Sequence, residues 1–290
     1  MLLAQITDLH VVAPGRGPQY GVDSNAMLAA AVDRLNGFDP APDALVITGD
    51  MVDLGVPEEY AVLRSELARL AVPVYLVAGN HDERAGLRTA FADHGYLPPG
   101  DGALNWCVEA HPLRLIGLDS TIPGRHDGAL DDASLAWLDA RLAERPDAPT
   151  VVALHHPPFE TGIWWMDRGG LLQGGPGLRA VVQRHPQVRR VVCGHHHRPI
   201  TTSWGSAVVS VCPSTAHQVH LDLAPESRPS FVTEPPMLQL HRWNAEELVT
   251  HNAYVQPTPP IDLLETWGGD WSKLRGRFRE RRPMYKTGPQ

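Results

Sequence analysis

The stretch VPVYLVAGNHD, residues 72–82, joins an apolar run to a polar turn and decides the expected fold. Residues 72–78 are typical of a buried strand, and Gly79, Asn80, His81 and Asp82 follow it directly. An apolar run followed by a short polar cluster recurs at four other places in the chain. These repeated units, separated by helical segments, predict an α/β fold with its polar clusters at strand ends.

The segments on either side extend this alternation of strands and helices. Strands are expected at residues 2–7, 44–48, 72–78, 105–109, 113–118, 150–154 and 188–193. Helices are expected at 24–35 with Ser24 as a possible N-cap, 57–70, 83–94, 132–145 and 178–185. Strands then dominate at 201–204, 207–211, 218–223, 237–243 and 248–254. This order predicts sheets that are covered by helices and are mixed rather than purely parallel.

Composition excludes several classes of protein. The chain has 290 residues, of which 43% are hydrophobic and 20% charged, as in a globular protein with one large domain or one domain plus an appendage. Its three distant cysteines argue against a disulfide framework, and with no apparent signal peptide they predict a cytoplasmic protein. No apolar run is long enough to cross a membrane. The net charge of −8 argues against nucleic acid as the main ligand.

The C-terminal region differs from the rest in charge. Seven Lys and Arg residues against one acid lie between Lys273 and Lys286, which leaves −8 − 6 = −14 for residues 1–272. The Pro-rich stretch at 256–260 predicts a boundary between a catalytic domain, 1–255, and an extension, 256–290. With Trp267 and Trp271, this extension is either a contact in a homodimer or larger homo-oligomer, or a solvated tail.

Five polar clusters follow the apolar runs in the first 197 residues. They contain Asp8 and His10, Gly49-Asp50, Asn80-His81-Asp82, His155-His156, and His195-His196-His197. In α/β sheets, ligands gather at the carboxyl ends of the strands, so we expect these clusters to meet on one rim. Carboxylate, amide and imidazole groups together suit Mn, Fe, Zn or Co. A single histidine is usually structural, but five ordered clusters predict a metal site.

The order D-x-H, G-D-x-x-D, G-N-H-D, H-H-P-P, G-H-x-H resembles the calcineurin-like metallophosphoesterase superfamily. Within it, the chain is most similar to bacterial class III cyclic-nucleotide phosphodiesterases and their glycerophosphodiesterase relatives. The resemblance runs from Asp8 to His197, and the stretch TAHQV extends it to Val219. It implies a four-layer α/β/β/α sandwich of two mixed sheets. It also implies a binuclear centre of two first-row metal ions, with Fe or Mn favoured and Zn or Co as alternatives.

The resemblance also implies a ligand set. One metal would be held by Asp8, His10, Asp50 and His197, and the other by Asn80, His155 and His195, with Asp50 bridging. We choose His155 over His156 because the ligand in such proteins directly follows the strand. His156 is then an outer or substrate-facing residue and His196 points away, while Asp53 and Asp82 orient their neighbours.

The implied reaction is hydrolysis of a phosphoester. Two metals can bind phosphate oxygens and deprotonate a bridging water for in-line attack. His81 would stabilise charge on the phosphate or protonate the leaving oxygen. His217 resembles a further phosphate-proximal histidine, with a surface-loop histidine as the alternative. Trp164 and Trp165, in the Gly-flanked segment 159–170, either cover the substrate as a flap or pack against protein.

One departure from the protein phosphatases of this superfamily favours diesters. Those proteins carry an arginine in G-D-x-x-D-R-G, and Leu54 stands at that position here. A singly charged diester needs less cationic help than a monoester, so we expect a phosphodiesterase acting on 3′,5′-cyclic nucleotides such as cyclic AMP, on glycerophosphodiesters, or on both. The alternatives are a broad phosphomonoesterase, a nuclease, and a metal-free protein-binding scaffold. A nuclease is disfavoured by the acidic body, and a scaffold by the complete ligand set.

Overall fold

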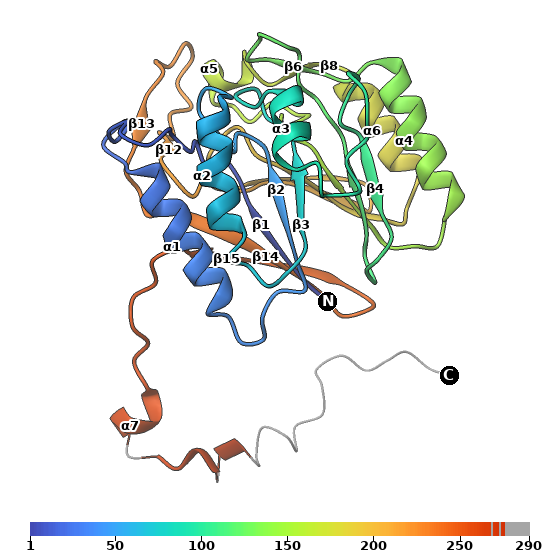
Figure 1. Cartoon of the computed structure of the whole chain (residues 1–290). Helices are drawn as coiled ribbons and strands as arrows, with labels where there is room; N and C mark the ends of the chain where they lie inside the picture. The colour runs from blue at the N-terminus through green and yellow to red at the C-terminus, as the bar shows by residue number, and fades with distance from the viewer. Residues whose placement is uncertain (268, 273, 276–290) are drawn as a thin grey trace, which may run out of the picture. The chain divides into compact units, whose positions relative to one another are not determined.

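The computed structural model describes residues 1–267, 269–272 and 274–275, and two large sheets form its centre (Figure 1). The first sheet contains β1 (Leu2–Ile6), β2 (Ala44–Thr48), β3 (Val74–Val77), β14 (Met237–Trp243) and β15 (Leu248–Tyr254). Its strand order is β15-β14-β1-β2-β3, with β1, β2 and β3 parallel and the two C-terminal strands antiparallel.

The second sheet has six strands in the order β10-β11-β9-β7-β5-β4. They are β4 (Trp106–Val108), β5 (Arg114–Gly117), β7 (Thr150–Ala153), β9 (Val188–Cys193), β10 (Ile200–Trp204) and β11 (Ala207–Val211). The four inner strands are parallel, and both edge strands are antiparallel to their neighbours. The mixed sheets expected from the alternation are therefore confirmed.

Three apolar cores separate four layers. The first sheet packs against α1 (Ser24–Asn36), α2 (Pro57–Leu67) and α3 (Arg84–Ala90). The second packs against α4 (Asp132–Glu144) and α6 (Gly175–Arg184). Leu3, Val46, Val151 and Val192 lie in the core between the two sheets. Because strand residues alternate in direction, each buried strand contributes to two of these cores. The α/β/β/α sandwich is thus confirmed.

A polar bridge also joins the two sheets near the rim. The amide nitrogen of Gln5 donates to Thr48 Oγ1 at 2.8 Å within the first sheet and to the Cys193 carbonyl at 3.0 Å in the second. The Gln5 amide oxygen lies 3.0 Å from His241 Nε2. A buried polar group with all its partners in place fixes how two surfaces meet, so Gln5 sets the relative position of the strand ends described below.

Several short elements differ from the expected ones. The structure adds β6 (Gly128–Ala129), α5 (Trp164–Asp167), β8 (Leu171–Gln173), β13 (Phe231–Val232) and α7 (Leu263–Trp267). The strand expected at 218–223 is only β12 (Gln218–Val219), paired with β13. Asp23, rather than Ser24, caps α1 by accepting from Ala26 N. Two-residue strands and single helical turns leave too little periodicity in a sequence to be recognised.

By internal contacts the chain divides into two compact units, Met1–Gln256 and Pro257–Gln290. In the second unit, α7 and the exposed Trp271 are described. Most of the basic run, residues 273 and 276–282, lies outside the described residues. Among the helices that are described, none combines the length and the apolar character that a membrane span requires.

Candidate metal centre

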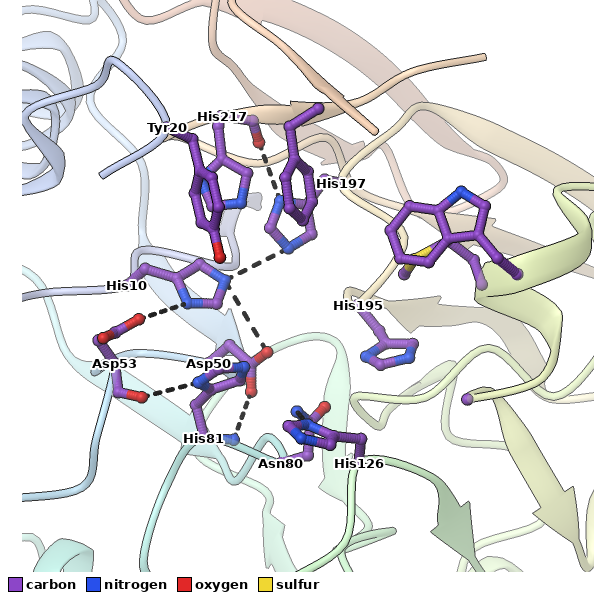
Figure 2. Close-up of a pocket in the computed structure, with 14 residues that line it drawn as sticks. His10, Tyr20, Asp50, Asp53, Asn80, His81, His126, His195, His197 and His217 are labelled. Atoms are coloured by element: carbon purple, nitrogen blue, oxygen red, sulfur yellow. Dashed lines mark hydrogen bonds and ion pairs between the residues drawn. The ribbon is translucent and has the colours of Figure 1, made fainter. Parts of the chain in front are cut away.

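The polar clusters lie at the carboxyl ends of five strands, β1, β2, β3, β7 and β9. The first two turns are joined directly, because Asp8 N donates to the Gly49 carbonyl and His10 N to the Asp50 carbonyl, both at 3.0 Å. Parallel pairing of β1, β2 and β3 places their ends side by side, and the pairing of β7 with β9 does the same in the second sheet. The clusters therefore meet on one rim, and Figure 2 shows those of their residues that line the pocket, among them His10, Asp50, Asn80, His195 and His197.

The backbone at these turns is strained. Eight non-glycine residues of the described chain have positive φ, and five of them are Asp8, His10, Asp50, His195 and His197, with φ between 45° and 69°. Such residues avoid the left-handed region unless the surrounding structure imposes it, and they concentrate at functional sites. The left-handed backbone conformation at these five residues turns their side chains back toward the strand ends.

Two glycines allow the turns to pack this closely. A Cβ atom on Gly79 would overlap the backbone nitrogen and carboxylate of Asp50, and one on Gly194 would overlap Thr7 Oγ1. Any larger residue at either position would push the turns apart. Gly79 and Gly194 are therefore needed because neighbouring turns lie where a side chain would begin.

The first group of side chains contains Asp8, His10, Asp50 and His197. His10 Nε2 lies 3.3 Å from His197 Nε2 and 3.9 Å from Asp50 Oδ2. His197 Nε2 lies 3.3 Å from Asp8 Oδ1. All four residues are buried, with at most 6% of any of them exposed. Two imidazole nitrogens and two carboxylates thus face one small volume.

The second group contains Asp50, Asn80, His155 and His195. Three atoms surround His155 Nε2: Asn80 Oδ1 at 3.1 Å, His195 Nδ1 at 3.2 Å and Asp50 Oδ1 at 3.4 Å. Asp50 belongs to both groups, one carboxylate oxygen facing each. We call the seven residues of the two groups the floor of the pocket.

Backbone carbonyls fix the protonation of three rings. His155 Nδ1 donates to the Thr48 carbonyl at 2.8 Å, and His197 Nδ1 to the His217 carbonyl at 2.9 Å. A carbonyl can only accept, so in the neutral rings the Nε2 atoms carry lone pairs that point into the two groups. His81 Nδ1 likewise donates to the Asp53 carbonyl at 2.7 Å, which leaves its Nε2 atom on the other side of the ring.

The donor set fits metal ions. Lone pairs of imidazole nitrogens and carboxylate oxygens that face each other repel unless a cation or proton lies between them. His195 Nε2 is buried and has no hydrogen-bond partner among the described residues. A buried polar atom without a partner is costly in a protein, so this second nitrogen of the ring whose Nδ1 faces His155 supports an ion bound beside His195.

Charges inside the floor reinforce this fit. Burial alone would raise the pKa of Asp50, but His155, His81 and His10 outweigh it and hold this pKa well below its usual value. Burial lowers the pKa of His155, yet the nearby Asp50 and Asp8 carboxylates raise it to about 9. The floor therefore keeps its central carboxylate ionised and attracts positive charge.

Outer residues hold the floor in place. Asp82 accepts from Gly79 N at 2.8 Å and from Met51 N at 3.1 Å, so it ties the β2 and β3 turns together. Burial and the Asp50 carboxylate raise its pKa to about 7. Asp53 Oδ1 lies 3.8 Å from His10 Nδ1, and Asp53 Oδ2 accepts from Gln19 Nε2 at 2.9 Å. Asp82 therefore supports the floor through backbone atoms of its turns, and Asp53 contacts the His10 ring of the floor from outside.

A pocket of about 290 Å³ opens above the floor. Its walls combine expected and unexpected residues. The lining residues are His10, Tyr20, Asp50, Asp53, Asn80, His81, His126, Trp165, Met166, Gly169, His195, His197, His217 and Phe231. His81, His217 and Trp165 thus line the pocket, together with five of the seven floor residues, His10, Asp50, Asn80, His195 and His197.

Two of the residues expected to contact substrate lie elsewhere. His156 is fully buried and is not among the lining residues; its Nδ1 lies 2.8 Å from Ser120 Oγ and its Nε2 donates to the His126 carbonyl at 3.1 Å. Trp164 is 38% exposed, and the Arg168 guanidinium lies 5.0 Å from its ring centroid. Neither side chain faces the space above the floor.

The segment that carries the two tryptophans is attached to the ligand turn of β9. Asp167 accepts from Thr161 N at 2.9 Å and from Gly162 N at 2.8 Å. The same carboxylate lies 3.3 Å from His196 Nε2. His196 therefore points away from the floor, as expected from its variable position, and supports the segment above it.

Sequence reasoning missed three lining residues, Tyr20, His126 and Phe231. Tyr20 and Gly21 form a two-residue turn between Gln19 and Val22, whose backbones exchange hydrogen bonds of 3.0 and 2.8 Å. His126 Nδ1 accepts from the Asn80 amide at 3.3 Å. A Tyr-Gly pair is a weak signal of such a turn, and the positions of His126 and Phe231 carry none.

Comparison with known proteins identifies the family of this chain. Residues 1–199 match the calcineurin-like phosphoesterase family, and the chain belongs to this family. The chain is 36% identical over 256 residues to a probable glycerophosphodiester phosphodiesterase from Arcobacter nitrofigilis, with 88% of this chain and 93% of that protein covered. It is 34% identical to a 3′,5′-cyclic-nucleotide phosphodiesterase from Nostoc, with 74% and 79% covered.

Solved structures agree on the fold. The chain is similar to a dimetal phosphatase from Danio rerio with a TM-score of 0.67 at 16% identity, over 88% of this chain and 96% of that one. At this identity the likeness shows the fold alone. Family membership and the candidate His and Asp clusters together indicate an enzyme that uses metal ions to hydrolyse phosphoesters.

Proposed function

We propose that this chain is a binuclear-metal phosphodiesterase in which Asp8, His10, Asp50 and His197 hold one ion. Asn80, His155 and His195 would hold the second, and Asp50, with one carboxylate oxygen facing each group, would be the ligand that the two ions share. The observation that carries this proposal is the pair of groups that share Asp50, with the lone pairs of His155 and His197 directed into them. Two bound ions supply positive charge to phosphate oxygens and lower the pKa of water.

The chain's own residues complete the site. The Nδ1 proton of His81 is held by the Asp53 carbonyl, and His81 lies in the pocket lining beside Asn80. When the ring is protonated on both nitrogens, its Nε2 atom can donate a proton to the phosphate or to the leaving oxygen. The His217 ring packs 4.7 Å from the ring of His197, which places it beside the first group.

The substrate class follows from charge. The lining of the pocket contains neither Lys nor Arg, so beyond the metal ions it offers no permanent cation to a phosphomonoester dianion. We therefore propose phosphodiesters as substrates, among them 3′,5′-cyclic nucleotides or glycerophosphodiesters, as the names of the relatives suggest. Iron or manganese suits the nitrogen and oxygen ligands, none of which is a thiolate.

One observation favours a phosphomonoesterase as second candidate. Position 54 lacks an arginine, but Arg16 reaches the same place from another segment, with its guanidinium 2.8 Å from Asp53 Oδ2. Arg16, Leu54 and His81 line a neighbouring depression. The Asp53 carboxylate already balances the charge of Arg16, which weakens its hold on a phosphate dianion.

A pair of aryl substrates tests the proposal. The kcat/KM for bis(p-nitrophenyl) phosphate should exceed that for p-nitrophenyl phosphate when Mn²⁺ is added. A clear preference for the monoester would favour the phosphatase instead. In that case Arg16→Ala should lower monoester turnover more than diester turnover. Arg145→Ala is the matched control, because Arg145 is also exposed and ion-paired but lies outside the pocket.

Location and assembly are further parts of the proposal. The free thiols of Cys107, Cys193 and Cys212 support a reducing compartment such as the cytoplasm. We propose a homodimer or larger homo-oligomer whose contact includes the region after Pro260, where Trp271 is 52% exposed. Deletion of residues 261–290 should lower the sedimentation coefficient, and an unchanged coefficient across salt concentrations would contradict this contact.

A further inference from the structure

Three aromatic residues from separate parts of the chain meet above the metal centre. Tyr20 comes from the turn before α1, Trp165 from α5 and Phe231 from β13. The ring centroid of Phe231 lies 4.6 Å from that of Tyr20 and 5.9 Å from that of Trp165. All three line the pocket, and we call them the aromatic roof. Figure 2 shows the Tyr20 ring above His10, with its hydroxyl group directed toward the floor.

The backbone of the roof is strained at Tyr20. This residue has φ of 50° as the first central residue of the two-residue turn with Gly21, and 62% of it is exposed. Glycine or asparagine is usual at such a position, so the tyrosine adds backbone strain while it places an aromatic ring at the pocket. Asp53 reinforces this placement, since it binds Gln19 in the same turn and also faces His10 of the floor.

The composition of the roof favours a cation. Its three residues are uncharged aromatic side chains, and the pocket lining contains neither Lys nor Arg. The faces of aromatic rings carry partial negative charge, and they attract ammonium groups that lie within about 6 Å of the ring centroid. Met166, also in the lining, adds an apolar and polarisable thioether.

Ring angles separate a rounded cation from a flat base. The plane of Phe231 is inclined by 47° to Tyr20 and by 83° to Trp165. A nucleobase stacks best on parallel faces, whereas a trimethylammonium group is rounded and contacts inclined faces equally well. The roof is also close to the floor, because the centroid of Phe231 lies 6.3 Å from that of His197. A short linker therefore suffices between the phosphate and the group under the roof.

We propose that the aromatic roof binds a quaternary ammonium group, so that the preferred substrates are phosphodiesters in which one alcohol is choline or a similar cation. This inference rests on the proposed phosphodiesterase function and specifies its substrate class. In glycerophosphocholine, the phosphate would lie on the floor and the trimethylammonium group against Phe231, Tyr20 and Trp165. The reaction itself is unchanged: water replaces one alcohol at phosphorus.

A neutral isostere provides the test. In 3,3-dimethylbutyl glycerophosphate a carbon atom replaces the nitrogen of choline, so shape is kept and charge is removed. The wild-type protein loaded with Mn²⁺ should hydrolyse glycerophosphocholine with kcat/KM roughly 3- to 30-fold above that for the isostere. Phe231→Leu and Trp165→Leu should reduce this ratio to about 1–2. Tyr254→Leu, which removes an exposed tyrosine outside the pocket, should leave the ratio unchanged.

Other outcomes would overturn the inference. Equal kcat/KM for the two diesters in the wild-type protein would mean that the charge is not recognised. A preference that persists in both variants would place recognition outside the roof. A KM increase in the variants that is larger for cyclic AMP than for glycerophosphocholine would make the roof a base-stacking surface. Hydrolysis of bis(p-nitrophenyl) phosphate is measured in parallel, since its absence would contradict the phosphodiesterase function itself.

Discussion

The floor and the aromatic roof of the same pocket are built in opposite ways. Residues of the floor directly follow strands of two sheets, are mostly buried and hold one another at 3.1–3.9 Å. The roof comes from a turn, a single helical turn and a two-residue strand, and Tyr20 and Phe231 are 62% and 36% exposed. The two sheets thus hold the residues expected to carry out the reaction. The residues expected to select the substrate lie on short, more exposed segments, whose sequence can vary without changing the floor.

The largest effect is expected at the residue shared by both groups of the floor. Asp50→Asn keeps the size of the side chain but removes the charge that faces His10 and His155. Affinity for both metals should fall by more than the roughly 10- to 100-fold that loss of an outer partner costs, and activity should disappear. Elemental analysis after dialysis measures metal content.

Asn80→Ala serves as the comparison, since Asn80 contacts only the second group and this variant should weaken mainly one site. Two metals retained at normal affinity in Asp50→Asn would rule out a bridging role for Asp50.

The next effect concerns proton transfer at the edge of the floor. His81→Ala should retain both metals but lower kcat by roughly 10²- to 10⁴-fold, because the ring that donates toward the leaving oxygen is gone. The loss should be larger for a diester with a poor leaving group than for bis(p-nitrophenyl) phosphate. Unchanged turnover of the poor substrate would exclude this role, and metal analysis distinguishes it from loss of the site.

A smaller effect is expected at His126, a residue of the pocket lining that contacts Asn80 of the floor. His126 Nδ1 accepts from the Asn80 amide group, which directs the Asn80 oxygen toward His155. His126→Ala should weaken the second metal by roughly 10-fold and leave the first unchanged. Calorimetric titration with Mn²⁺ measures the two affinities. His220→Ala, an exposed histidine outside the pocket, is the control, and equal titration curves for the two variants would leave His126 without a positioning role.

The smallest effect is expected in the roof. Tyr20→Gly removes the ring but relieves a backbone strain of about 1 kcal/mol or more, because glycine adopts φ of 50° at little cost. The melting temperature should stay the same or rise slightly, while KM for glycerophosphocholine increases. Tyr20→Phe, which keeps the ring, should retain a KM near that of the wild type. A clear fall in melting temperature for Tyr20→Gly would mean that Tyr20 stabilises the fold.

The sequence by itself determined mixed sheets covered by helices, the strands that carry the polar clusters and the side chains available to a metal. Apolar runs such as residues 74–77 are local signals, and the polar residues of Gly79-Asn80-His81 follow at once, so no distant contact is needed to recognise them. The family resemblance added the four layers and the expected division into two ion sites. His196 was also placed correctly, away from the floor.

Only the tertiary structure decided which residues cover the site. Tyr20, His126 and Phe231 are far from one another in sequence, and they line one pocket because the fold brings three separate segments above the same rim. The structure likewise places Arg16 beside Asp53, near a position where the sequence shows only Leu54. A strand end is specified by the residues adjacent to it, whereas the path of a loop depends on everything that packs beneath it, and this physical difference limits what the sequence alone can reveal.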